Sequence, residues 1–124
     1  ERDSGGAIRP EALEVLASAD QVLEWQAAAA RLHVAEAVSG YILDLFEKAR
    51  DRGWMLSPRA ALGLQRAARA RAFLRGRDHV LPEDVQEVFA PVVAHRLAQF
   101  STAPSDAHEA AGMAEALRRE TPVR

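Results

Sequence analysis

Two helix starts, separated by one complete helix, constrain the fold of this chain more than any other feature. Ser57 is a good N-cap, because its hydroxyl can accept a hydrogen bond from a backbone N–H that the first helical turn leaves free. Pro58 follows at the first helical position, where a missing N–H costs nothing. The sequence therefore predicts a helix from Pro58 to about Arg75, which Gly76 ends, and a further helix that begins at Pro82.

Composition favours helices throughout the chain. The 124 residues are 48% hydrophobic, which fits one domain with a core, and alanine is abundant. Aromatic and β-branched runs are scarce, which argues against a sheet. The absence of cysteine excludes disulfides, zinc fingers and thiol catalysis and is compatible with a cytoplasmic protein, and no apolar run approaches the roughly 20 residues that span a bilayer. We predict an all-α fold, a small bundle of four to five helices.

Periodicity and capping signals place the other helices. Ser18 and Gln21 match a capping box, so a first helix is expected to begin near Ala19. Pro91 is expected to kink or split the helix that begins at Pro82. The predicted helices cover about 19–32, 35–52, 58–75, from 82 onward, and 106–119, with loops or extended connections at 33–34, 78–81 and 101–106. The first helix is expected to bury Val22, Trp25, Ala29 and Leu32 on one face.

Domain organisation follows from the same reading. Residues 1–17 are expected to form a loose N-terminal lead-in, because they are polar at the start and carry Ser4-Gly5-Gly6. Residues 18–100 are expected to form the helical domain, and residues 101–124 a loop and a helix that packs on it.

Charge is distributed unevenly along the chain, although the formal net charge is only −2. Residues 57–77 carry six arginines and no acidic residue, whereas the segments on either side are net acidic. Such a basic helix needs anionic neighbours, which can be the flanking helices, a phosphate or a partner surface. Nucleic acid is disfavoured as a partner, because the acidic flanks would repel a polyanion.

Arg59 is the candidate functional residue, because it lies in the first turn of a helix, where the helix dipole disfavours a cation. The alternative is an ordinary solvated arginine. No catalytic group is predicted, since the chain has neither a phosphate-binding loop nor a nucleophile motif. His33 and Glu36 have a spacing that could hold a metal, but a second such pair is missing, so no metal site is predicted.

The motifs taken together resemble the C-terminal lid domain of MoxR-type AAA+ ATPases. The resemblance covers roughly residues 18–97 well and both ends more loosely. The chain departs from the family pattern in two places. Met55-Leu56 stands where the family usually has a glycine and a small residue. Leu81 stands where the family usually has a threonine or serine cap, and this change should weaken the next helix start by about 1 kcal/mol. The resemblance rests on Tyr41-Ile42, Arg50, Ser57-Pro58-Arg59-Ala60, Gly76-Arg77-Asp78, Pro82-Glu83-Asp84-Val85, His95-Arg96-Leu97 and Thr121-Pro122-Val123.

This resemblance implies a lid and not a whole enzyme. It implies that Arg59 stands at the sensor-two position, where an arginine contacts the γ-phosphate region of ATP and reports the nucleotide state, in this clade at a neighbouring subunit's site. Ser57 and Arg66 could support it, although pairing with an acid of a neighbouring helix is the expected role of Arg66. The implied partners are the ATPase core of its own chain, preceding the lead-in, and neighbouring subunits of a hexameric ring. ATP and magnesium would be bound by that core and not by this chain alone.

Two alternatives remain open from the sequence. A stand-alone helical protein-interaction module would need no upstream ATPase core and would bury a partner at Trp54 or at the alanine-rich faces. A DNA-binding helical domain would read nucleic acid with the basic helix, and its binding would fall steeply with added salt.

Overall fold

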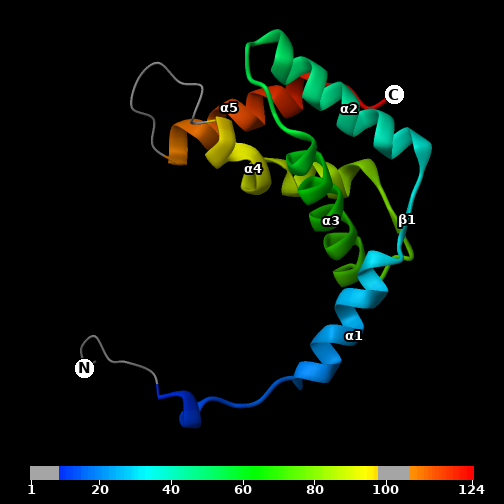
Figure 1. Ribbon diagram of the computed structural model, residues 1–124, viewed down its shortest axis with the longest axis vertical. Coiled ribbons are helices and arrows are strands. Elements are labelled where there is room, and N and C mark those ends of the chain that lie inside the picture. The colour runs from blue at the N-terminus through cyan, green and yellow to red at the C-terminus, as the bar shows by residue number, and fades with distance from the viewer. Residues whose placement is uncertain (1–8, 98–106) are drawn as a thin grey trace.

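Five α-helices form most of the regular structure in residues 9–97 and 107–124, the part of the chain that the computed structural model describes (Figure 1). The prediction of an all-α bundle of four to five helices is confirmed, whereas the loop predicted over 101–106 lies outside the described residues. The elements are the 3₁₀ turn η1 (Pro10–Ala12), α1 (Ala19–Ala30), β1 (His33–Val34), α2 (Glu36–Asp51), α3 (Pro58–Leu74), β2 (His79–Val80), α4 (Pro82–Leu97) and α5 (Ala107–Glu120).

The core lies where α4 packs against both α3 and α5, and where α2 contacts α4 and α5 (Figure 1). Small alanine side chains on one face of α3 allow it to lie close to α4. Larger aliphatic and aromatic side chains from the other helices fill the rest of the core. The fully buried side chains include Leu45, Leu64, Ala68, Ala72, Val85, Phe89, Val93, Leu97, Ala114 and Leu117.

A glycine ends each of two helices: Gly53 follows α2, and Gly76 follows α3. Gly53 has φ +82° and Gly76 has φ +76°, in the left-handed region that favours glycine. The residue after each glycine donates its N–H back into the last helical turn, from Trp54 to the Ala49 oxygen at 2.9 Å and from Arg77 to the Ala72 oxygen at 3.0 Å. Both ends are therefore Schellman motifs, and Gly76 ends α3 as predicted.

A short parallel strand pair joins two connections that the sequence analysis left separate. His33 pairs with His79, and Val34 with Val80, so the predicted break and the predicted extended connector are hydrogen-bonded to each other. Two-residue strands carry no alternating pattern, which explains why this pairing could not be predicted from the sequence. The pair ties the junction of α1 and α2 to the junction of α3 and α4.

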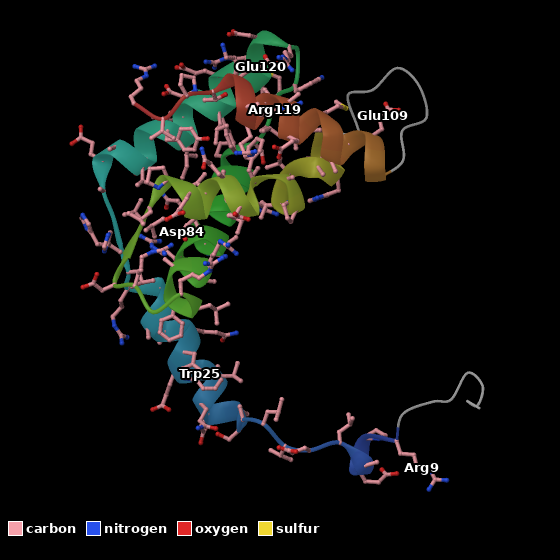
Figure 2. The ribbon with its side chains drawn as sticks, turned by 180° about the vertical axis from the view of Figure 1, so that it is seen from behind. Arg9, Trp25, Asp84, Glu109, Arg119 and Glu120 are labelled. Carbon is pink, nitrogen blue, oxygen red and sulfur yellow. The ribbon has the colours of Figure 1, made fainter. Side chains whose placement is uncertain are left out.

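The predicted apolar face of α1 is wrong at its N-terminal half. Ala29 and Leu32 are buried, but Val22 is 40% exposed and Trp25 is 46% exposed. The helix start itself is confirmed, because the Ser18 hydroxyl accepts from the Gln21 N–H at 3.1 Å while the Gln21 side chain accepts from the Ser18 N–H at 2.9 Å. Figures 1 and 2 show α1 and the segment before it extending away from the other helices.

Pro91 does not split the fourth helix, because α4 is continuous from Pro82 to Leu97. Pro91 is exposed, whereas Phe89 and Val93 on either side of it are buried. Burial of these neighbours holds the helix together across the backbone hydrogen bond that proline cannot donate. Among the described residues, no helix is both long and apolar enough to cross a membrane.

Candidate functional site

The start of α3 is built as the sequence predicts. The Ser57 hydroxyl accepts a hydrogen bond from the Ala60 N–H at 3.2 Å, and Pro58 occupies the first helical position. Ala60 is buried against the bundle, which fixes the orientation of this turn. Arg59 lies in the same turn with its side chain exposed, and no acidic residue accompanies it there. Ser57 thus caps the helical turn that carries Arg59.

The six arginines of residues 57–77 divide into two groups by whether their side chains have partners among the described residues. The members of the first group lie toward the end of α3 and just beyond it, and they have partners, two of which are acidic residues of α4. The partners are the Leu32 carbonyl oxygen for Arg69 Nε at 3.1 Å, Glu87 for Arg71 at 3.7 Å, and Asp84 for Arg77. Arg59, Arg66 and Arg75 form the second group, for whose side chains residues 9–97 and 107–124 provide no hydrogen-bond or ion-pair partner.

Two of these three side chains, Arg59 and Arg66, lie between the start and the middle of α3, whereas Arg75 follows its last residue. The expected pairing of Arg66 with an acid of a neighbouring helix is wrong for the described residues, and its side chain is exposed. Seven residues separate the two arginines, which puts them on nearly the same face about 10 Å apart along the helix axis. The positive end of the helix dipole lies at the same place, so this surface is suited to bind an anion.

An ion pair with a buried carboxylate, which sequence reasoning missed, joins the start of α4 to the residues just after α3. Asp84 is 0% exposed, and one of its carboxylate oxygens pairs with Arg77, the residue that follows the terminal glycine of α3. The other oxygen accepts from the Leu81 N–H at 2.8 Å. An acidic residue at the third helical position was the available signal, because a carboxylate there can reach back to the N-cap backbone.

The same contact changes the meaning of Leu81. A leucine at this position cannot supply a side-chain cap, so the sequence predicts a weaker helix start. In the structure the Asp84 carboxylate satisfies the Leu81 N–H, and the Asp84 N–H bonds to the Leu81 oxygen at 2.9 Å. Half of a capping box is therefore present without a threonine or serine.

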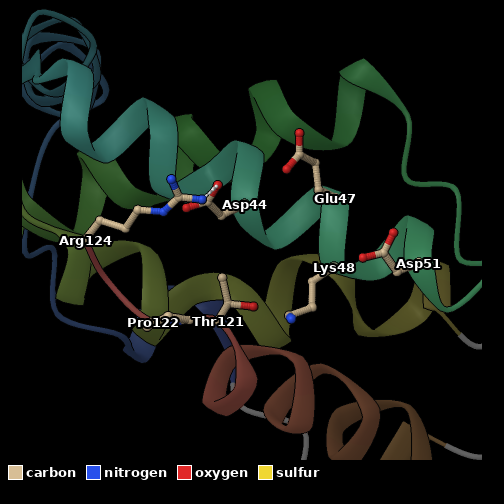
Figure 3. Close-up of a pocket in the computed structure, with 7 residues that line it drawn as sticks. All are labelled: Asp44, Glu47, Lys48, Asp51, Thr121, Pro122 and Arg124. Atoms are coloured by element: carbon tan, nitrogen blue, oxygen red, sulfur yellow. Dashed lines mark hydrogen bonds and ion pairs between the residues drawn. The ribbon is translucent and has the colours of Figure 1, made fainter.

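A hollow lies between α2 and the C-terminal residues (Figure 3). Arg124 pairs with Asp44 at 3.1 Å across it, and the Thr121 hydroxyl donates to the Leu117 carbonyl oxygen at 2.7 Å. Its other charged residues, Glu47, Lys48 and Asp51, have mixed signs. This hollow therefore anchors the chain end on α2 and does not present a uniform charge to a ligand.

No metal centre is evident within the described part of the chain. No group of three or more histidine, cysteine or acidic side chains in residues 9–97 and 107–124 could hold a metal ion. Arg59 suits a phosphate, because a guanidinium can donate two parallel hydrogen bonds to phosphate oxygens.

Comparison with known proteins shows the family to which this helical domain is similar. A family model described as an AAA lid domain matches residues 49–117. Chaperone MoxR1 of Mycobacterium tuberculosis is 36% identical over 74% of this chain and 27% of its own length, and Protein MoxR of Paracoccus denitrificans is 42% identical over 52% and 24%. Protein MoxR of Methylorubrum extorquens is 56% identical over 33% of this chain and 12% of its own length. No solved structure matches the chain significantly.

The matched region contains all of the elements that form the candidate site, from the end of α2 through α3 and α4. The chain spans about a quarter of the length of the first two curated relatives. It belongs to the AAA lid domain family, and it is the lid of a MoxR-type AAA+ ATPase.

Proposed function

We propose that this lid couples ATP binding and hydrolysis in the remaining part of the full-length protein to movement of subunits in a ring. Arg59 is the residue that reports the nucleotide state in this proposal. The observation that carries it is an exposed arginine, without a partner among the described residues, on a capped helix start that faces solvent. A cation at this end of a helix is unfavourable for folding alone, so a role outside folding accounts for it.

The mechanism follows from how α3 is held. Contact between the Arg59 guanidinium and the γ-phosphate region of ATP would fix the start of α3 relative to the nucleotide. Because α3 packs along α4 and the Arg77–Asp84 pair fixes their junction, a displacement at Arg59 would move the helices together. Loss of the γ-phosphate would remove the contact and release the lid to rotate.

The full-length protein is proposed to be an ATP hydrolase, with ATP and magnesium held by its core and with action in the cytoplasm. We assign to it the chaperone-like remodelling of other proteins, or the insertion of cofactors into them. The resemblance to MoxR-type proteins and the name of the mycobacterial relative support this proposal. The lid itself contributes movement and no bond-breaking group.

Purified full-length protein and this 124-residue chain should be compared directly for magnesium-dependent ATP turnover. The full-length protein is expected to hydrolyse ATP, whereas the chain alone is expected to show no turnover above the buffer rate, because neither a phosphate-binding loop nor a metal-binding acidic pair occurs in its sequence. Magnesium-dependent turnover by the chain alone would contradict its role as a lid.

The DNA-binding alternative is disfavoured by the pairing of the arginines. Three of the six in residues 57–77 are engaged by Glu87, Asp84 and a backbone oxygen, so they do not form a continuous basic face for phosphates. The interaction-module alternative gains support from one observation, the apolar side chains that α1 and the preceding segment leave exposed.

A further inference from the structure

Two histidine side chains lie beside each other on the outer face of the short strand pair. His33 of β1 and His79 of β2 are partners in the parallel register, and neighbouring strands lie about 4.8 Å apart. Both histidines are exposed, whereas Val34 packs against the core and Val80 is buried. Successive side chains of a strand point to opposite faces, so the two valines face the core and the two imidazoles face solvent together.

The neighbouring Asp78 determines which ring nitrogen of His79 is free. His79 Nδ1 lies 2.8 Å from Asp78 Oδ1, and an ionised carboxylate can only accept a hydrogen bond, so Nδ1 carries the proton that it donates. In the neutral ring this leaves Nε2 with a free lone pair. A carboxylate bound to the far nitrogen of the ring is also the arrangement that orients histidine ligands at metal sites. His79 can therefore bind a cation through Nε2.

The backbone beneath both histidines is held in place. The Leu32 carbonyl oxygen, just before His33, accepts a hydrogen bond from Arg69 Nε at 3.1 Å. The side chain of Val80, just after His79, is 2% exposed and belongs to the core. Ligands whose backbones are fixed before binding lose less conformational entropy when an ion joins them.

The strand pair supplies the second histidine that the spacing of His33 and Glu36 does not provide along the chain. His79 is distant in the sequence, and the pairing of β1 with β2 brings it beside His33. Two imidazoles of one molecule can bind the same ion, because the second is held at a high effective concentration once the first has bound. No group of three or more histidine, cysteine or acidic side chains in the described ranges could hold a metal ion, so the two histidines form an open, exchangeable site and not a closed structural centre.

We propose that His33 and His79 together bind one divalent transition-metal ion of the kind that imidazole favours, Zn²⁺, Ni²⁺ or Cu²⁺. The bound ion would join the α1–α2 connection to the α3–α4 connection across β1 and β2, and it would thereby stabilise the folded lid. The site follows the C-terminal end of α3, whereas Arg59 lies at the start of that helix. This proposal therefore does not depend on the binding of a nucleotide by Arg59, and either one can fail without the other.

Isothermal titration of the 124-residue chain with NiCl₂ tests the proposal, in a chelator-free buffer at about pH 8, where imidazole is neutral. The native chain is expected to bind one Ni²⁺ with a Kd of about 1 to 100 µM. His33→Gln and His79→Gln each replace an imidazole by an amide, which nickel binds poorly, and each should weaken binding at least about tenfold. His95→Gln is the matched control, because His95 is an exposed histidine of α4 outside the strand pair, and it should bind Ni²⁺ like the native chain.

Stoichiometry and ion selectivity distinguish this site from other kinds of cation binding. A native chain that binds no Ni²⁺ at about 1 mM, or two histidine variants that bind it as tightly as the native chain, would overturn the proposal. Half an ion per chain, with dimers in sedimentation velocity, would show an ion shared between two molecules and would overturn it as well. MgCl₂ in about tenfold excess should not displace Ni²⁺, because Mg²⁺ takes oxygen ligands, and displacement would indicate acidic side chains instead.

Urea denaturation provides a second readout, because an ion that joins β1 to β2 binds the folded chain and not the unfolded one. ZnCl₂ should raise the urea midpoint of the native chain and of His95→Gln, and EDTA should reverse the rise. His33→Gln and His79→Gln should not respond, and circular dichroism without metal verifies that both are folded. An equal rise in all four proteins would contradict a site formed by the strand pair.

Discussion

Arg59→Ala in the full-length protein is expected to lower ATP turnover at least about tenfold, while ATP affinity changes by only a few-fold. Arginines that stabilise charge on the transferred phosphoryl group contribute about 10³- to 10⁵-fold to turnover, so tenfold is a conservative bound for a residue at the γ-phosphate region. Affinity is largely retained because the core supplies the other phosphate contacts. Steady-state turnover measured together with nucleotide binding checks this expectation.

Two arginines of the same region serve as controls for this experiment. Arg75→Ala removes an equally exposed arginine without a partner among the described residues, but at the far end of α3, and turnover should not change. Arg66→Ala, on the same face as Arg59, should give an intermediate loss. In the isolated chain, Arg59→Ala should leave the unfolding free energy unchanged or raise it by a few tenths of a kcal/mol, because a cation leaves the positive end of the helix dipole. Turnover equal to wild type would return Arg59 to an ordinary surface residue.

Asp84→Ala is expected to lower the free energy of unfolding of the chain by about 3 kcal/mol. The substitution leaves Arg77 without its carboxylate partner and the Leu81 N–H without an acceptor, and breaking a buried pair from one side typically costs about 3 to 5 kcal/mol. The lower end of that range applies because the Arg77 side chain keeps 25% exposure and can regain some hydration. Urea denaturation of the chain measures the difference.

Glu83→Ala is the matched control for Asp84→Ala, because Glu83 is an exposed acid in the same helical turn. It should change stability by less than about 0.5 kcal/mol. The double variant Arg77→Ala/Asp84→Ala should lose less than the sum of the two single losses, since no unpaired charge remains. A loss of less than 1 kcal/mol for Asp84→Ala would contradict the structural role of the pair.

The helix boundaries could be predicted because their signals are local. Ser57 with Pro58 and the glycine at position 76 act within one or two turns, so the sequence alone places both ends of α3 correctly. Burial of a helix face depends on residues that are distant in the sequence. Periodicity places Val22 and Trp25 on one face of α1, but whether that face is covered depends on a partner that the described residues do not provide.

The candidate site shows the same division between local and distant information. The place of Arg59 in a capped first turn follows from local signals and could be expected. The pairing of Arg77 with Asp84 depends on a turn between two helices, and the parallel pairing of His33 with His79 depends on residues far apart in the chain. That no acid among the described residues pairs with Arg66 likewise depends on how the helices pack, which the sequence pattern does not specify.

Hydrogen–deuterium exchange at the start of α3 tests the central claim most directly. Full-length protein with a non-hydrolysable ATP analogue should be compared with the ADP state, for wild type and for Arg59→Ala, in peptides that cover residues 55–62. The account predicts that the analogue slows exchange there in wild type and has no such effect in Arg59→Ala. The same slowing in both proteins would show that the lid responds to nucleotide without Arg59 and would contradict the account.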